Sequence, residues 1–569
     1  MIFSEYSIII NERESGGNFM NKKLLGTVLL SGVLLAACGN NTDPTSATSG
    51  ESSKSEQVLN QMVLQEMPTA DLSLATDIIS VAALNNVYEG LYRIDAENKA
   101  EPAGAAELAS VSDDGLVYTL KLREDAKWSN GDPVTAQDYV YGWQRTVDPA
   151  TASQYAYLYT PVAGATDIME NGADVSTLGI KAVSDYELEI TLDVATPYFD
   201  YLLAFTPFFP QHQATVEEFG KDFAQTSDNA VYNGPFVLSE FDGPGADTEW
   251  SYQKNPDYWD AKNVQLDAIN VSVIKESSTG LNLFNDGQLD DVTLTGELAQ
   301  QNANEEAYTV DKMSRTTYLE MNQRDENSPF RNANLRRALA YAIDRDTMVE
   351  QILGDGSIAA TGLVPSDMSF NPDTGADFVE DAKTKVGYDL DKAKEYWEKA
   401  KQELGIDSLS FSILTDDTDS TKMVSQYLQG AWQDAFGDMK VELTVVPFAV
   451  RLDRSTSGDF DVLLGGWGAD YSDPSSFTDL FTEGNTYNRG QWSNPEYDKL
   501  VQEAATTNAN NPEKRWQNLL DAEDVMISDM GVIPVYQKAE GHLRATKVKD
   551  VVVHGAGAPY DFKWAYIEE

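Results

Sequence analysis

The nine residues that begin at Gly466 combine side chains that are suited to holding a charged group. They read Gly466-Trp467-Gly468-Ala469-Asp470-Tyr471-Ser472-Asp473-Pro474. The tryptophan offers a flat apolar wall and Asp470 a fixed negative charge, while the two glycines let another backbone approach closely. This combination suits the ammonium end of a peptide. Taken alone, the same residues are also compatible with a strand that ends in a capped turn.

A strand and a turn must position these side chains. The run 460–464, which reads Phe-Asp-Val-Leu-Leu, predicts a short buried strand directly before the motif. The residues Tyr, Ser, Asp and Pro that follow Asp470 end regular structure. We therefore expect the segment 466–470 to form a loop at the end of this strand.

Few residues elsewhere have the types and spacing that catalysis or metal binding requires. Cys38 is the only cysteine, the three histidines are widely spaced, and no CxxC, HExxH, GxSxG, P-loop or GxGxxG pattern occurs. Asp416, Asp417 and Asp419 resemble the start of a calcium loop, but the glycine and glutamate that complete such a loop are missing, which favours a solvated turn. We therefore predict no enzyme activity, no catalytic residue, no cofactor and no metal site.

Length and charge restrict the class of protein. The chain has 569 residues, enough for two to four domains or one large multi-lobed protein. Its formal net charge of −51 would repel phosphate backbones and anionic lipid heads, which argues against nucleic-acid binding. The 27 tyrosines and 10 tryptophans argue against a disordered chain and provide the surfaces that line broad binding clefts.

The N-terminal region predicts an export signal and a lipid anchor. Residues 1–19 read as an upstream extension, and 20–37 as a signal peptide whose apolar run of about fourteen residues is too short to span a bilayer. Small residues before Cys38 resemble the bacterial lipobox, which implies a diacylglycerol anchor on its sulfur, stable because it has two chains. Residues 38–55 read as a flexible tether. The alternative is an ordinary secretory signal with an incidental cysteine.

After the tether, hydrophobic periodicity predicts alternating strands and helices. Strands are expected at 58–64, 117–122, 188–194, 236–238, 249–254, 269–273, 409–414, 441–446, 532–537 and 550–553. Helices are expected at 80–92, 136–145, 335–343, 392–404, around 427–432, and at 495–507 and 512–529, with Thr135, Asn334 and Asp391 as N-caps. The order in 409–446 indicates a βαβ unit.

Several segments in this order resemble one family. They are Val117–Arg123 with Ala126–Ala136, Asn233–Phe236, Asn255–Asp260, Asn334–Leu339 and Gly466–Tyr471. Together they resemble the signature of the oligopeptide, dipeptide and nickel solute-binding proteins of ABC importers, over roughly 58–567. The chain is most similar to the oligopeptide-binding members and, because of Cys38, to their Gram-positive lipoprotein form.

The resemblance implies an α/β fold of the three-lobed, periplasmic-binding-protein-like type (type II, cluster C), with the ligand cleft between two major lobes. Carried over to this chain, lobe I comprises 56–89, 211–315 and 530–569. Lobe II comprises 90–210, and lobe III comprises 316–529. The polypeptide would cross between lobes more than once, and ligand binding would close them by a hinge motion.

The resemblance also implies the ligand contacts. Asp470 would pair with the peptide α-amino group, and a short strand at 78–80 would pair with the ligand backbone, as in β-augmentation. The full set of expected peptide-binding residues is Asp470, Trp467, Gly466, Gly468, Tyr155, Ile78, Ile79, Ser80, Phe448 and Tyr536. Unlike Asp470, the aromatic residues of this set could instead belong to an ordinary core.

One position departs from some relatives, which carry an arginine three residues before the motif tryptophan. Here that residue is Leu464. Arg451 and Arg454 lie nearby in the sequence, but no pattern places them in the cleft. We therefore predict no tight clamp on the ligand C-terminus and tolerance of longer peptides.

The resemblance implies a monomeric, lipid-anchored receptor on the extracellular face of the cell membrane, with no nucleic-acid partner. It would deliver oligopeptides to the permease and ATPase subunits of an ABC importer. Alternatives are the same fold dedicated to one signalling peptide (a pheromone) or to nickel, haem or a glycan. A surface peptidase and a lipid-anchored adhesin are the alternatives outside this class.

Overall fold

The structure, a computed structural model, describes residues 57–568. The predicted upstream extension, the signal peptide, Cys38 and the whole tether lie outside the described residues. Within 57–568, no helix combines the length and the apolar character that a bilayer span requires.

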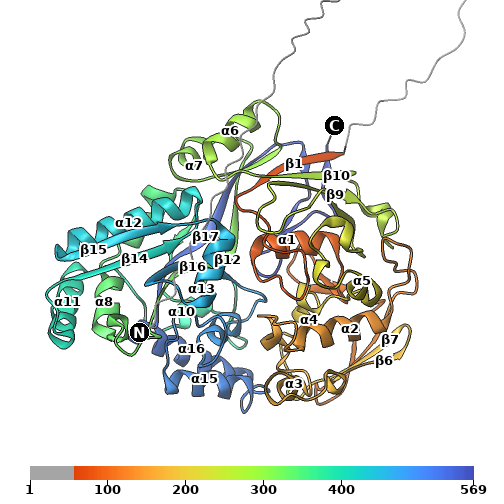
Figure 1. The fold of residues 1–569 in the computed structure, drawn as a ribbon, viewed down its shortest axis with the longest axis horizontal. Coiled ribbons are helices and arrows are strands. Elements are labelled where there is room, and N and C mark those ends of the chain that lie inside the picture. The colour runs from red at the N-terminus through yellow and green to blue at the C-terminus, as the bar shows by residue number, and fades with distance from the viewer. Residues whose placement is uncertain (1–56, 569) are drawn as a thin grey trace, which may run out of the picture. The chain divides into compact units, whose positions relative to one another are not determined.

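One sheet of eleven strands forms the centre of the described chain (Figure 1). Its order is β15 (Met439–Val445), β14 (Leu409–Thr415), β16 (Val462–Gly468), β12 (Tyr308–Met321), β17 (Val532–Arg544), β11 (Asp291–Leu294), β1 (Val58–Val63), β10 (Ala268–Val273), β9 (Glu249–Lys254) and β8 (Phe236–Ser239), with β13 (Ile358–Ala359) paired to β17. The strands expected at 236–238 and 249–254 are confirmed, and they form an antiparallel ladder.

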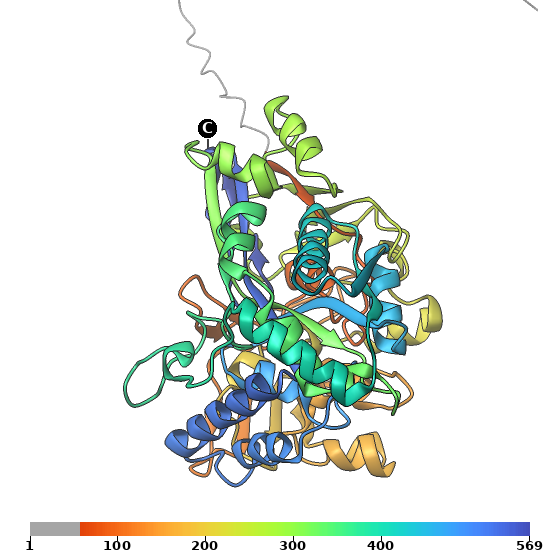
Figure 2. The ribbon, with the colours of Figure 1, turned by 90° about the vertical axis from the view of Figure 1, so that its left-hand side faces the viewer.

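The long strands β12 and β17 connect the two ends of this sheet. They lie side by side and antiparallel, as Figures 1 and 2 show, and their register shifts between Lys312 and Thr316. β12 also pairs with β16, and β17 also pairs with β11. The middle of β12 therefore lies beside the glycine-rich end of β16.

The predicted βαβ unit is confirmed. Strands β14 and β15 are parallel, and α12 (Asp419–Phe436) connects them. Helix α11 (Leu390–Leu404) ends, as expected, at Gly405, whose φ of 67° suits glycine. Two predicted caps are wrong by two positions, because Asn332 and Asp389 accept the bond from the backbone N–H three residues on.

A second, antiparallel sheet lies within residues 110–191. Its order is β4 (Ser110–Val111), β5 (Val117–Lys121), β7 (Glu187–Thr191) and β6 (Ile180–Ser184). Helix α2 (Ala136–Val147) begins at the predicted cap, where Thr135 and Asp138 form a reciprocal capping box. Trp143 lies on the buried face of α2, and its indole N–H donates a hydrogen bond to the Phe208 carbonyl.

The remaining longer helices surround these sheets (Figures 1 and 2). They are α1 (Ile78–Val87), α3 (Ala165–Asn171), α5 (Gln213–Phe219), α6 (Ser277–Asn285), α7 (Gly296–Asn302), α8 (Ala333–Tyr341), α13 (Phe448–Ser457), α15 (Pro495–Ala505) and α16 (Pro512–Asp529). The two predicted late helices match α15 and α16. The predicted lobe boundaries stay a prediction.

Candidate functional site

A cavity of about 120 Å³ lies where β16, the middle of β12, α13 and the start of α1 meet. This volume equals that of roughly four water molecules in the liquid. Eight of the ten predicted site residues line it: Ile78, Tyr155, Phe448, Gly466, Trp467, Gly468, Asp470 and Tyr536. Ile79 and Ser80 do not. The structure therefore brings together most of a set that is spread over nearly the whole chain.

The expected loop over 466–470 is wrong for Gly466–Gly468, which belong to strand β16, and is confirmed for residues 469–470, which lie outside any strand. Strand β16 continues through Gly468, because β12 supplies a hydrogen-bonded partner for each of these residues. Trp467 pairs with Thr316, and Gly466 pairs with Thr317. A Cβ on Gly466 would lie 2.9 Å from the Thr316 carbonyl oxygen, so this position requires glycine for the close approach of β12.

The opposite edge of this end of β16 has no strand beside it in the described chain. β14 pairs only with Val462 and Leu463, whereas β12 pairs with all of Val462–Gly468. The segment Leu464–Gly468 also lines the cavity. An extended chain can therefore add to this edge and satisfy its own backbone donors and acceptors, which would otherwise cost about 1–3 kcal/mol each when buried.

Asp470 presents a buried carboxylate to this cavity. Its side chain is 6% exposed, and the Tyr155 hydroxyl donates to its Oδ1 over 2.8 Å. Its Oδ2 has no hydrogen-bond partner among residues 57–568. Burial raises the pKa of Asp470 to about 8, and the bond from Tyr155 only partly opposes this. A cationic donor is the partner that would best stabilise the ionised form.

Aromatic rings form the wall around this carboxylate. Trp467 packs against Tyr487 with ring centroids 4.4 Å apart, and Tyr155 lies 6.1 Å from Trp467 and 6.0 Å from Tyr487. The Trp467 indole nitrogen is buried and without a partner in the described part of the chain. Sequence reasoning missed Tyr487, because the motif that contains Trp467 carries no signal for a residue twenty positions later.

Arginines line the same cavity. No sequence pattern placed Arg451 in the cleft, but the structure does. Arg451 is 5% exposed, forms no ion pair within the described chain, and its Nε lacks a hydrogen-bond partner. Burial lowers its pKa to about 10, against the opposing influence of Asp416. Arg315 and Arg489 also line the cavity. Arg454 does not, and pairs with Asp459 over 2.8 Å.

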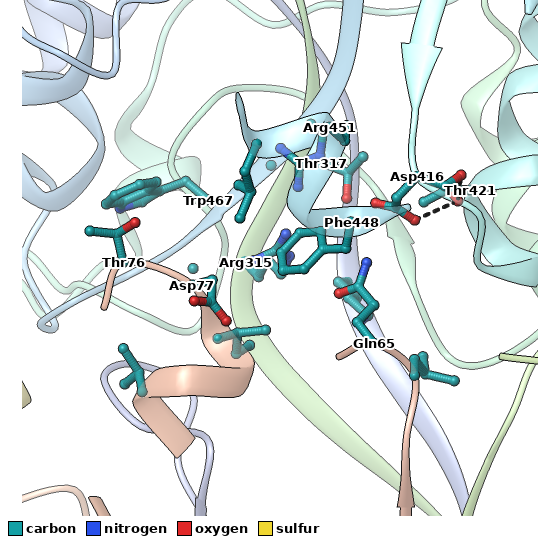
Figure 3. Close-up of a pocket in the computed structure, with 18 of the residues that line it drawn as sticks. Gln65, Thr76, Asp77, Arg315, Thr317, Asp416, Thr421, Phe448, Arg451 and Trp467 are labelled. Atoms are coloured by element: carbon teal, nitrogen blue, oxygen red, sulfur yellow. Dashed lines mark hydrogen bonds between the residues drawn. The ribbon is translucent and has the colours of Figure 1, made fainter. Parts of the chain in front are cut away.

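In Figure 3, Arg451 is drawn near Thr317, and Arg315 is drawn between Asp77 and Phe448. The Arg451 guanidinium carbon lies 5.0 Å from the centre of the Phe448 ring. The cavity thus offers unpaired guanidinium groups as well as the unpaired carboxylate oxygen of Asp470. Such an arrangement suits a ligand that carries both charges.

The expected strand at 78–80 is wrong, because these residues form the first turn of α1. Asp77 caps this helix, and its Oδ1 accepts hydrogen bonds from the backbone N–H groups of Ile79 and Ser80. Those donors are therefore not free to pair with a ligand. Asp77 itself lines the cavity, and burial raises its pKa to about 6. The sequence signal that could have identified Asp77 as a cap was its position directly before an apolar helix.

The expectation of a solvated turn at the aspartates 416–419 is also wrong for Asp416, which is 6% exposed and lines the cavity. Its Oδ1 accepts hydrogen bonds from the hydroxyls of Thr418 and Thr421, one of which is drawn in Figure 3. In 57–568, no cluster of three or more His, Cys, Asp or Glu side chains is arranged to hold a metal ion.

Comparison with known proteins agrees with this geometry. Residues 99–489 match the family model described as bacterial extracellular solute-binding proteins, family 5, middle region. The chain is 39% identical over 557 residues to the dipeptide-binding protein of Lactococcus lactis, which covers 96% of this chain and 98% of that protein.

Two solved structures are similar throughout. Listeria monocytogenes OppA bound to peptide has a TM-score of 0.87 at 39% identity and covers 91% of this chain and 100% of its own. The pheromone receptor PrgZ, described with its mode of peptide binding, has a TM-score of 0.86 at 40% identity and covers 90% and 100%. The predicted fold class is thereby confirmed as the α/β type of periplasmic binding proteins. The chain belongs to family 5 of the bacterial extracellular solute-binding proteins.

Proposed function

We propose that this protein captures oligopeptides in extended form outside the cell and delivers them to an ABC importer. The observation that carries this proposal is the buried, unpaired Oδ2 of Asp470 beside the open edge of β16. The ammonium group of a peptide would bind Asp470, and its backbone would pair with Gly466 and Gly468. The pockets for the side chains of the peptide would be lined by Trp467, Tyr155, Phe448 and Tyr536.

The other end of a short peptide would meet Arg451 and Arg315. Neither guanidinium has an ion pair among residues 57–568, and a carboxylate accepts two parallel bonds from an arginine. Tolerance of longer peptides was expected because no tight clamp on the ligand C-terminus was predicted. These arginines would supply a contact for the C-terminus of a short peptide. A short ligand would use these arginines for its C-terminus, whereas a longer one would pass them, so tolerance of longer peptides stays a prediction.

The partners and the location belong to the same proposal. Membership of an extracellular solute-binding family supports a role outside the membrane. We propose that Cys38 carries the lipid anchor, that the protein acts as a monomer, and that the importer's permease and ATPase subunits complete the system. Such a receptor releases its ligand intact, so we expect no cleavage of bound peptides and no cofactor.

Native mass spectrometry of protein purified without refolding tests the proposal. We expect a heterogeneous series of added masses that correspond to co-purified peptides, and its depletion in Asp470→Asn. Asp479→Asn is the matched control. Burial also raises the pKa of Asp479, to about 7, but this residue does not line the cavity. An unchanged series in Asp470→Asn would contradict the proposed anchor.

The similarity to PrgZ supports one second candidate, a receptor dedicated to a single signalling peptide. The same experiment distinguishes the two. A single sharp added mass, which library peptides do not displace, would indicate a dedicated ligand.

A further inference from the structure

Two guanidinium groups of the cavity have no acceptor in the part of the chain that the structure describes. The side chains of Arg315 and Arg451 neither form an ion pair there nor donate a hydrogen bond, and the Nε of Arg451 is buried. The other two cations that line the cavity, Arg489 and Lys538, each lie 3.5 Å or less from a glutamate oxygen. The unmatched positive charge of the cavity is therefore concentrated on Arg315 and Arg451.

These two groups lie beside the same short stretch of β16. The Nη2 atom of Arg315 is 3.3 Å from the position that a Cβ on Gly466 would occupy. The Nη1 atom of Arg451 is 3.9 Å from the corresponding position on Gly465. The absence of side chains on these two neighbouring glycines leaves room for both guanidinium groups. We call Arg315 and Arg451 together the arginine site.

The carboxylate of Asp416 does not neutralise this site. It forms no ion pair with either arginine, and its Oδ1 accepts hydrogen bonds from the hydroxyls of Thr418 and Thr421. Burial lowers the pKa of Arg451 to about 10, and although Asp416 opposes this, the charge of Arg315 adds to it. A buried cation without a counter-ion is costly, and the planar fork of a guanidinium matches the two oxygens of a carboxylate.

We propose that the arginine site holds one small carboxylate anion, such as acetate, whenever no peptide C-terminus occupies it. The inference rests on the proposed function, in which only a short peptide with a free C-terminus meets Arg315 and Arg451. A longer peptide passes them and an amidated one presents a neutral group, so both guanidinium groups would be enclosed without a counter-ion. The free anion supplies that charge, which lets one cavity hold peptides of different lengths.

The test measures peptide affinity by calorimetry while acetate replaces chloride at constant ionic strength. Acetate competes with the carboxylate of a tripeptide that has a free C-terminus, so the affinity of this peptide should fall. If acetate binds with a dissociation constant of about 10 mM, the fall at roughly 100 mM acetate is about tenfold. The amidated tripeptide and an octapeptide should instead bind roughly three- to tenfold more tightly, because the anion stabilises their complexes more than the ligand-free protein.

Matched variants locate these opposite effects. Arg451→Met should remove both of them. Arg454→Met should keep both, since Arg454 pairs with Asp459 outside the cavity. Acetate effects of the same sign on all three peptides, or opposite effects that persist in Arg451→Met, would overturn the inference.

A second measurement needs no peptide. Acetate labelled with carbon-13, titrated with ligand-free protein and followed by NMR, should show saturable line broadening with the wild type and with Arg454→Met but not with Arg451→Met. No saturable broadening, or equal broadening with Arg451→Met, would overturn the anion site. Failure of all three peptides to bind, alongside saturable broadening that Arg451→Met removes, would instead contradict the proposed function.

Discussion

The Tyr155 hydroxyl donates a hydrogen bond to Asp470 across a separation of 315 residues, and this contact holds the carboxylate against the wall of the cavity. The bond uses only Oδ1, so Oδ2 stays available. Because burial raises the pKa of Asp470 to about 8, the charge that would bind an ammonium group depends on pH within the physiological range.

We predict that peptide affinity rises about tenfold per pH unit from pH 6 towards 8. Below its raised pKa, Asp470 must lose a proton before it can pair with the ammonium group, and above about pH 8 the peptide amine loses its own. Affinity should therefore be highest near pH 8. Calorimetry in buffers of different ionisation enthalpy would measure proton release on binding at pH 6.5. The rising limb should be absent in Asp470→Asn, and a flat profile for the wild type would refute the assignment.

Arg451→Met should weaken binding of short peptides with a free C-terminus by roughly 10- to 100-fold, the value of a hydrogen bond to a charged group. The amidated forms of the same peptides should lose little, because they lack the carboxylate. Titration of tri- to octapeptides in both forms provides the measurement. Arg454→Met is the control, since Arg454 pairs with Asp459 outside the cavity. Equal losses for free and amidated peptides would rule out a carboxylate contact.

Tyr198→Ala should weaken peptide binding about two- to tenfold, although Tyr198 does not line the ligand cavity. Tyr198 stacks on Tyr471 with ring centroids 4.2 Å apart and an interplanar angle of 5°, which holds the segment around Tyr198 against the loop after β16. If ligand entry separates these segments, loss of the stack favours the open form.

Small-angle scattering of the ligand-free Tyr198→Ala protein should show a larger radius of gyration than the wild type. Tyr388→Ala, a change at a residue that is 53% exposed, should leave both affinity and radius unchanged. If Tyr198→Ala behaves like this control, the stack has no role in closure.

Gly466→Ala should lower the free energy of unfolding by about 1–3 kcal/mol, because its Cβ would lie 2.9 Å from the Thr316 carbonyl and force β12 and β16 apart. Gly468→Ala is the matched control two residues along the same strand, where the nearest atom to the added Cβ is 3.9 Å away. Denaturant titration of both variants measures the difference. Equal stability would show that the strands adjust without cost.

Local patterns predicted much of this fold. Alternating apolar residues marked β5, β9, β10 and β14, and helical periodicity marked α2, α15 and α16, since these signals arise from neighbours within about ten residues. The motif around Asp470 was visible for the same reason, because its glycines, tryptophan and carboxylate are consecutive.

What only the tertiary structure decided is which distant groups line the same cavity as Asp470. Arg315 and Arg451 read in the sequence as ordinary charged residues, and they reach the cavity because the β12–β16 ladder and the packing of α13 bring them there. The same ladder extends β16 through Gly468, since hydrogen bonds to β12 outweigh the weak strand preference of glycine. The sequence by itself thus determined the fold class and the carboxylate, whereas long-range strand pairing determined the shape and the opposite charge of the site.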